Sequence, residues 1–251
     1  MIRKTTLALI IILSSVITHA QLSKYLAPVN PAYLEYLKNI AHEGSSADSV
    51  NKQLGYIPPY TILPESNETA GSQQNLLKYA TLDTLPSSYD LRKLSLLTPV
   101  ENQGTGNFGG NCWAFSTMSA IESDWLKEGY GKSILSEQNM ITCHGFLWGF
   151  GVGGNEYLSL GYLMRLKGPV SAGDIPYNTV DTVTFHCNYA PVVAYVPEAR
   201  WVNSNVAFVK RIIMDYGAVS SNLYWDDSYY KGSPYYTYCY SGNSSPNPAF
   251  T

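Results

Sequence analysis

Apolar residues recur every three or four positions in several stretches of the chain, which is the spacing of one face of a helix. This pattern predicts helices over residues 113–127, from Ser136 onward, over about 156–167 and over about 206–216. The first of these helices has the clearest apolar stripe, formed by Ala114, Met118, Ile121 and Trp125.

Capping residues support these helix boundaries. Ser136 and Asn155 stand where N-caps are preferred, and Leu135 and Met140 occupy the two positions of a hydrophobic staple around Ser136. Gly217 follows the last helix, where a left-handed residue commonly ends one.

Two later apolar runs, residues 192–196 and 218–224, predict strands. Helices therefore dominate the first part of this region, and strands are expected in the later part. This order favours an α+β fold built as two lobes.

The N-terminus has the pattern of an export signal. Arg3 and Lys4 precede an apolar run over residues 7–16, which is too short to span a bilayer comfortably. We expect residues 1–20 to be a signal peptide cut after Ala20, with an uncleaved anchor as the alternative. Because no other stretch is long and apolar enough to cross a membrane, the mature protein is expected to be secreted or held in the cell envelope.

Residues 21–84 differ from the rest of the chain. Asn30 and Pro31 predict a helix start, and Gly44 predicts its end. Polar and proline-rich stretches follow. This segment is either a pro-segment that covers a cleft or a simple linker.

Composition restricts the possible partners. The 251 residues carry a formal net charge of −3, and 45% of them are apolar, which is enough for a packed core. The absence of a strongly basic surface pattern argues against nucleic acid as a partner.

The candidate chemistry lies around Cys112, directly at the start of the helix over residues 113–127. A thiol there lies at the positive end of the helix dipole, which favours the nucleophilic thiolate. Gln103 lies upstream, beyond the glycine-rich loop 104–110, and its amide can donate to an oxyanion. The alternative is a buried and inert cysteine.

These residues belong to a series of motifs that resembles the papain-like cysteine peptidases. In chain order they are Leu-Pro-Ser-Ser-Tyr-Asp-Leu-Arg from residue 85, Gln103, Cys112-Trp113-Ala114-Phe115, Leu135-Ser136-Glu137-Gln138, Gly153-Gly154-Asn155 and Ile175-Pro176-Tyr177. The resemblance implies a peptidase domain over residues 85–251. Its fold would be papain-like, with a helical lobe that carries the nucleophile and an incomplete β-rich lobe.

The resemblance also implies a role for each matched residue. Cys112 would attack the peptide carbonyl, and Gln103 with the Cys112 backbone N–H would hold the oxyanion. Gly153 and Gly154 would align the backbone of a peptide or protein substrate, and Trp113 would pack beside the site. No cofactor or metal is implied.

The four cysteines are Cys112, Cys143, Cys187 and Cys239, and the sequence alone leaves three complete pairings open. The family resemblance implies a Cys143–Cys187 disulfide and leaves Cys239 over. A second family disulfide lacks both halves, because glycines occupy positions 109 and 151. The pairs Cys143-His144 and His186-Cys187 raise a metal site as an alternative, but their spacing is unusual for one.

The family mechanism also needs a histidine, about 130–150 residues after the cysteine. The four histidines are His19, His42, His144 and His186, and none has that position. We therefore expect an inactive fragment that stops before the catalytic His and Asn. The alternative is a non-catalytic secreted module that binds peptide or glycan, using the seven tyrosines between residues 224 and 240.

Overall fold

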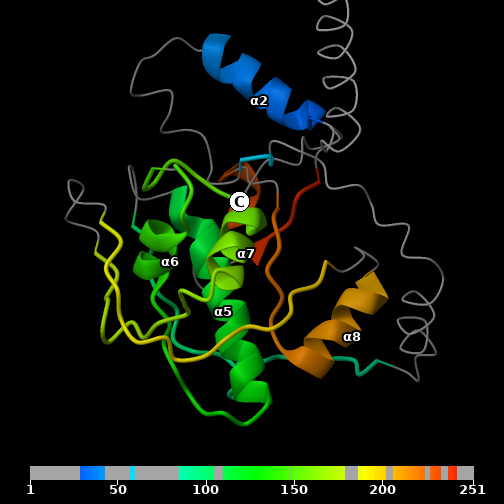
Figure 1. Cartoon of the computed structure of the whole chain (residues 1–251). Coiled ribbons are helices and arrows are strands. Elements are labelled where there is room, and N and C mark those ends of the chain that lie inside the picture. The colour runs from blue at the N-terminus through cyan, green and yellow to red at the C-terminus, as the bar shows by residue number, and fades with distance from the viewer. Residues whose placement is uncertain are drawn as a thin grey trace, which may run out of the picture.

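The computed structural model describes residues 29–42, 57–59, 85–104, 110–147, 149–178, 186–201, 206–223, 227–232 and 237–241. Its elements in chain order are α2 (Pro31–His42), α5 (Cys112–Lys127), α6 (Glu137–Cys143), α7 (Glu156–Met164), α8 (Val206–Tyr216), a 3₁₀ turn (Asp227–Tyr229), β1 (Tyr230–Lys231) and β2 (Thr237–Tyr238). Figure 1 shows α5 at the centre, with α6 and α7 beside it and α8 to one side.

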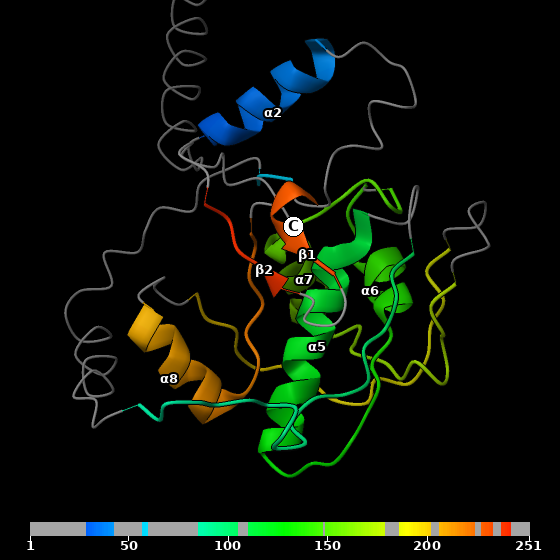
Figure 2. The ribbon, with the colours of Figure 1, turned by 180° about the vertical axis from the view of Figure 1, so that it is seen from behind.

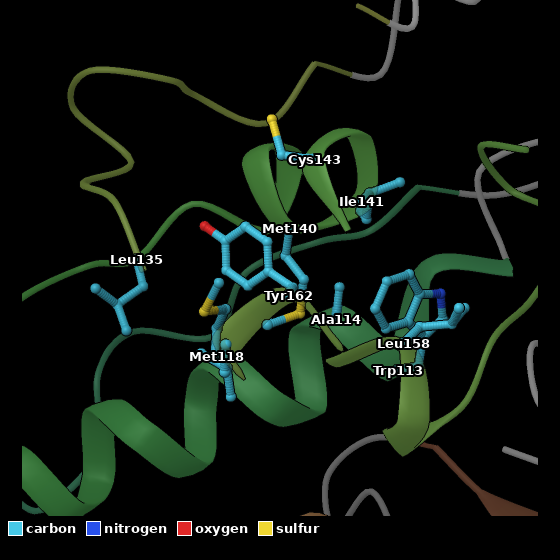
Figure 3. Close-up of a cluster of buried hydrophobic side chains, with 10 residues drawn as sticks. Trp113, Ala114, Met118, Leu135, Met140, Ile141, Cys143, Leu158 and Tyr162 are labelled. Atoms are coloured by element: carbon cyan, nitrogen blue, oxygen red, sulfur yellow. The ribbon is translucent and has the colours of Figure 1, made fainter. Parts of the chain in front are cut away.

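The core lies where α5 meets α6 and α7. Ala114 and Met118 of the α5 stripe are completely buried, and Ile121 and Trp125 continue the stripe along its edge. The expected apolar face is therefore confirmed. Figure 3 shows side chains from all three helices and from the loops between them converging on one cluster, which comprises Trp113, Ala114, Met118, Leu135, Met140, Ile141, Cys143, Leu158, Tyr162 and Leu163.

The predicted N-caps are confirmed. The Ser136 hydroxyl accepts a hydrogen bond from the Asn139 N–H at 3.0 Å and donates one to the carbonyl of Ile175 at 2.6 Å. The Asn155 side chain accepts from the N–H groups of Tyr157 and Leu158 at the start of α7. Both caps thus satisfy donors that a helix start leaves without intrahelical partners.

One of the two later helices ends where the sequence predicted, and the other ends early. Helix α8 matches the expected range of 206–216, and Gly217 follows it with φ +102°. Helix α7 ends at Met164, earlier than the expected residue 167. Leu166 has φ +56°, a left-handed conformation that does not continue a right-handed helix.

The two predicted strands are wrong. Val192 forms an isolated bridge with Val170, and no strand is assigned over the rest of 192–196. Residues 218–223 form no strand either, and Ala218 donates its N–H to the Ser123 hydroxyl of α5. An apolar run becomes a strand only where a neighbouring backbone completes its hydrogen bonds.

The strands that do form lie within the tyrosine-rich segment. β1 and β2 pair antiparallel, with Tyr230 opposite Tyr238, and the rings of Tyr229 and Tyr240 pack edge to face at 4.9 Å. Figure 2 shows this hairpin on the side of α5 that faces away from the viewer of Figure 1. Two of the seven tyrosines between residues 224 and 240 therefore lie in the paired strands of this hairpin.

Helix α2 confirms the short helix predicted after Asn30, whose side chain accepts from the Ala32 N–H at 3.0 Å. It lies apart from α5, α6 and α7 in both views (Figures 1 and 2). The expected signal peptide, residues 1–20, lies outside the described residues. Within the described part of the chain, no helix has the length and apolar character needed to cross a membrane.

A disulfide joins Cys143 and Cys187, with their Cα atoms 4.8 Å apart, and confirms the pairing that the resemblance implied. It ties the end of α6 to the segment that begins at residue 186. Since both sulfurs are consumed in this bond, the alternative of a metal site at these cysteines is wrong. Neither Cys112 nor Cys239 forms a disulfide with another described residue.

Candidate active site

The thiol of Cys112 lies at the N-terminal end of α5. Cys112 is the first residue of the helix and is partly exposed, so reagents in solvent can reach it. The N–H groups of a first helical turn and the positive end of the helix dipole both favour a thiolate at this position. The electrostatic environment that the sequence predicted is therefore present.

Gln103 is brought to the same region by a tyrosine. The Tyr177 hydroxyl donates to the backbone carbonyl of Gln103 at 2.9 Å and accepts from Nδ2 of Asn111, the residue before Cys112, also at 2.9 Å. Gln103 is partly buried, and its Oε1 atom has no hydrogen-bond partner among the described residues. A buried amide oxygen without a partner in the protein is an acceptor that a ligand can use.

The predicted glycine pair packs against Trp113. A Cβ on Gly154 would lie 2.4 Å from Nε1 of the Trp113 indole, so any larger residue would displace the ring. Gly153 has φ +96°, a conformation that L-residues rarely adopt. The structure thus brings the glycine pair and the tryptophan together, as the sequence predicted.

An unexpected residue lies on this glycine pair. The N–H of Ile57 donates to the carbonyl of Gly154 at 2.9 Å, and Nδ2 of Asn155 donates to the carbonyl of Ile57 at 2.7 Å. Ile57 is 4% exposed, and the buried Pro58 follows it. Figure 1 shows this short segment at the α2 side of α7.

Sequence reasoning missed this contact. Ile57 precedes Pro58, and a residue before proline is biased toward an extended backbone. That signal could have marked residues 57–59 as an extended peptide. Nothing in the sequence says which surface such a peptide contacts, because 97 residues separate Ile57 from Gly154 in the printed sequence.

The described histidines lie elsewhere. The His144 ring is almost completely buried, its Nδ1 accepts from the Phe146 N–H at 3.0 Å, and it packs edge to face against Trp113. Burial, with a smaller contribution from the charge of Arg165, lowers the pKa of His144. His186 is exposed next to the disulfide. His144 is therefore a buried part of the core with one ring nitrogen already engaged.

Comparison with known proteins decides the family. The model of the papain family cysteine proteases matches residues 85–245, more than half of the chain. The chain belongs to the papain family. Cathepsin M of Mus musculus is 36% identical over 109 residues, which are 43% of this chain and 31% of the mouse protein. A cathepsin L-like proteinase of Phaedon cochleariae is also 36% identical, over 104 residues, 39% of this chain and 29% of that protein.

Solved structures agree with this membership. The cysteine protease and lectin-like domains of Cwp84, a surface layer associated protein of Clostridium difficile, match with a TM-score of 0.59 and 28% identity. That match covers 82% of this chain and 42% of the clostridial one. The chain thus spans about a third of the length of the curated relatives and less than half of this structure. The α+β papain-like fold, with a helical lobe and few strands, is confirmed.

The segment just before α5 packs closely against the loop that leads to the glycine pair. A Cβ on Gly110 would lie 2.1 Å from the carbonyl oxygen of Gly151, so the two backbones touch. The Asn111 side chain accepts from the Gly151 N–H at 2.9 Å. Close glycine packing and one buried hydrogen bond therefore join the two loops at this place.

Proposed function

We propose that this chain carries the nucleophile of an exported cysteine peptidase. The Cys112 thiolate attacks the carbonyl carbon of a peptide bond, and the oxyanion accepts from Gln103 and the Cys112 N–H. The C–N bond then breaks, and the amine leaves with a proton from an imidazole. Water hydrolyses the resulting thioester and releases the acid and the thiolate.

The observation that supports this proposal is the pair of hydrogen bonds that Ile57 makes with Gly154 and Asn155. The carbonyl of Gly154 and the side chain of Asn155 bind the N–H and C=O of a single extended residue. Backbone hydrogen bonds of this kind recognise a peptide without regard to its side chains. The glycine pair next to Trp113 therefore has the contacts that a peptide substrate needs.

The same contact supports a pro-segment rather than a linker for residues 21–84. Ile57 and the two prolines after it lie where a substrate backbone is expected, and Ile57 is nearly completely buried. A bound segment of the same chain competes with substrate at a high effective concentration. The segment thus keeps the site latent until it is displaced or cleaved. Export by residues 1–20 places the protein in the cell envelope or outside the cell.

We further propose that residues 1–251 alone hydrolyse peptides slowly. His144 is buried with Nδ1 engaged, and His186 is exposed beside the disulfide. His19 and His42 precede the matched family region, which begins at residue 85. A thiol that lacks an imidazole partner depends on the helix terminus alone to stabilise its thiolate, and it loses proton transfer to the leaving amine.

The test is covalent labelling by a peptide that carries a chloromethyl ketone, followed by mass spectrometry of the labelled peptides. We expect Cys112 to react faster with this reagent than with a chloromethyl ketone that lacks the peptide, because the peptide binds the glycine pair. Cys112→Ala should remove the label at this position and leave the circular dichroism spectrum unchanged. Cys239→Ser is the matched control and should label like the wild type.

A second variant tests the pro-segment. Ile57→Asp places a carboxylate in a nearly closed apolar site, which is costly without a partner, and should speed peptide-directed labelling of Cys112. Equal rates for the two proteins would contradict latency. If Cys112 shows no preference for the peptide reagent while the protein still binds the peptide, the non-catalytic binding module is the better description.

A further inference from the structure

Asn111 stands at the centre of a hydrogen-bond chain just before the nucleophile. Its side chain is 1% exposed. Oδ1 accepts from the Gly151 N–H at 2.9 Å, and Nδ2 donates to the Tyr177 hydroxyl at 2.9 Å. That hydroxyl in turn donates to the Gln103 carbonyl at 2.9 Å. The Tyr177 hydroxyl has one proton, which it donates to Gln103, and its oxygen accepts from Asn111. The donor and acceptor roles are therefore consistent along this series of hydrogen bonds.

These hydrogen bonds connect segments that are far apart in the sequence. Tyr177 is 74 residues from Gln103 and 66 from Asn111, and Gly151 is 40 residues from Asn111. These segments are the one that carries Gln103, the residue before the nucleophile and the loop that leads to the glycine pair. One buried network therefore sets the mutual position of all three.

Aromatic rings fix the tyrosine at the centre of this chain. The ring of Phe115 packs edge to face on Tyr177 with the centroids 4.8 Å apart, and Phe150 stacks on it at 6.1 Å. Phe115 comes from α5 and Phe150 from the loop before the glycine pair. With its ring held from two sides, the Tyr177 hydroxyl has little freedom to leave its two partners.

We propose that Asn111 and Tyr177 are positioning residues of the peptidase site. They hold Gln103, the start of α5 and the Gly151–Gly154 loop in one arrangement, next to the close approach of Gly110 to Gly151. This assignment rests on the proposed peptidase function. Neither side chain reacts, and each acts through the backbone of the residues that do.

A second tyrosine, Tyr162, offers a matched control for removal of the Tyr177 hydroxyl. Tyr162 is completely buried and its hydroxyl donates to Oδ1 of Asn139 at 2.6 Å, which joins α7 to α6. Tyr162→Phe and Tyr177→Phe each delete one hydrogen-bonded tyrosine hydroxyl. The first leaves the three site segments connected, whereas the second cuts the link to Gln103. A purely structural role for Tyr177 predicts equal behaviour of the two variants.

The experiment measures the rate of Cys112 alkylation by iodoacetamide against pH, with the exposed Cys239 in the same protein as the internal reference. Loss of the network loosens the first turn of α5 and weakens its stabilisation of the thiolate. We expect the midpoint of the Cys112 profile to move up by about 0.5 pH unit in Asn111→Ala and by a smaller amount in Tyr177→Phe. Tyr162→Phe should match the wild type.

Hydrolysis of a fluorogenic peptide by the full-length protein gives the second readout. Tyr177→Phe should lower kcat about tenfold with KM unchanged, whereas Asn111→Ala should also raise KM because it releases the Gly151 loop. If Asn111→Ala fails to fold, the alkylation profile and the kcat of Tyr177→Phe alone test the positioning role.

The two proposals fail in different ways. If the wild-type protein hydrolyses no peptide but the alkylation profiles of Asn111→Ala and Tyr177→Phe still shift, the peptidase function is contradicted and the positioning role stands. Alkylation profiles of Asn111→Ala and Tyr177→Phe that coincide with that of Tyr162→Phe overturn the positioning role, whether or not the protein hydrolyses peptides.

Discussion

The helical lobe around α5 and the region from residue 186 to 241 bury their apolar residues to very different extents. The lobe has ten buried side chains in one cluster from three helices and their loops. In the described part of 186–241, Gly217 alone is fully buried, and α8 has no buried residue. Trp201 and Val206 are 56% and 67% exposed.

Polar contacts join the two regions, and Val196 of the later region also packs against the apolar cluster. Ala218 donates its N–H to the Ser123 hydroxyl at 2.9 Å, and the hydroxyls of Ser116 and Ser220 lie 2.7 Å apart. The disulfide at Cys187 supplies the covalent link. The comparison teaches that the helical lobe carries most of the stabilising burial, while the later region depends on its attachment to that lobe.

The largest expected effect is the loss of the disulfide. It closes a loop of 44 residues, and its removal should lower the free energy of unfolding by about 4 kcal/mol through the added entropy of the unfolded chain. The variant is Cys143→Ala with Cys187→Ala, measured by urea unfolding. Cys239→Ser is the control and should leave the midpoint unchanged. Equal stability of both proteins would show that the later region needs no covalent attachment.

A core truncation should come next in size. Met118→Ala empties a completely buried position of α5 and should cost about 3 kcal/mol, since both burial and packing are lost. Val206→Ala in α8 removes an exposed side chain and should change stability by less than about 0.5 kcal/mol. Thermal unfolding of the two variants gives the comparison directly. A similar loss for both would contradict the contrast between the regions.

The third expected effect is a dependence on pH, and it is the smallest of the three when taken per pH unit. Burial, and then the charges of Glu101 and Glu122, raise the pKa of Glu137 from 4.5 to about 8. The folded protein therefore holds a proton that the unfolded chain releases near pH 4.5. The free energy of unfolding should fall as the pH rises from about 4.5 to about 8, by at most ~1.4 kcal/mol per pH unit. Glu137→Gln should flatten this slope in urea unfolding at several pH values.

A matched control for this prediction lies in the later region. Glu198 is exposed, and its hydrogen bond with Arg200 lowers its pKa. Glu198→Gln should leave the slope between pH 4.5 and 8 as it is in the wild type. A slope that survives in Glu137→Gln would assign the pH dependence to Glu122, whose pKa burial also raises.

Local features of the fold could be predicted because their causes are local. The caps at Ser136 and Asn155 satisfy donors within three residues, and the apolar stripe of α5 follows from helical spacing alone. The strands over 192–196 and 218–224 failed for the opposite reason. A strand needs a partner from elsewhere in the chain, and the apolar pattern does not say whether one is present.

The sequence by itself indicated the family through an ordered series of motifs, and it placed Cys112 at a helix start through the apolar spacing that follows it. The resemblance to the family implied the pairing of Cys143 with Cys187. Only the tertiary structure decided that Ile57 occupies the glycine pair and that Asn111 and Tyr177 join the parts of the site. These contacts span from 40 to 98 residues. Hydrogen bonds over such separations depend on how the helices pack, and no local pattern in the chain specifies that packing.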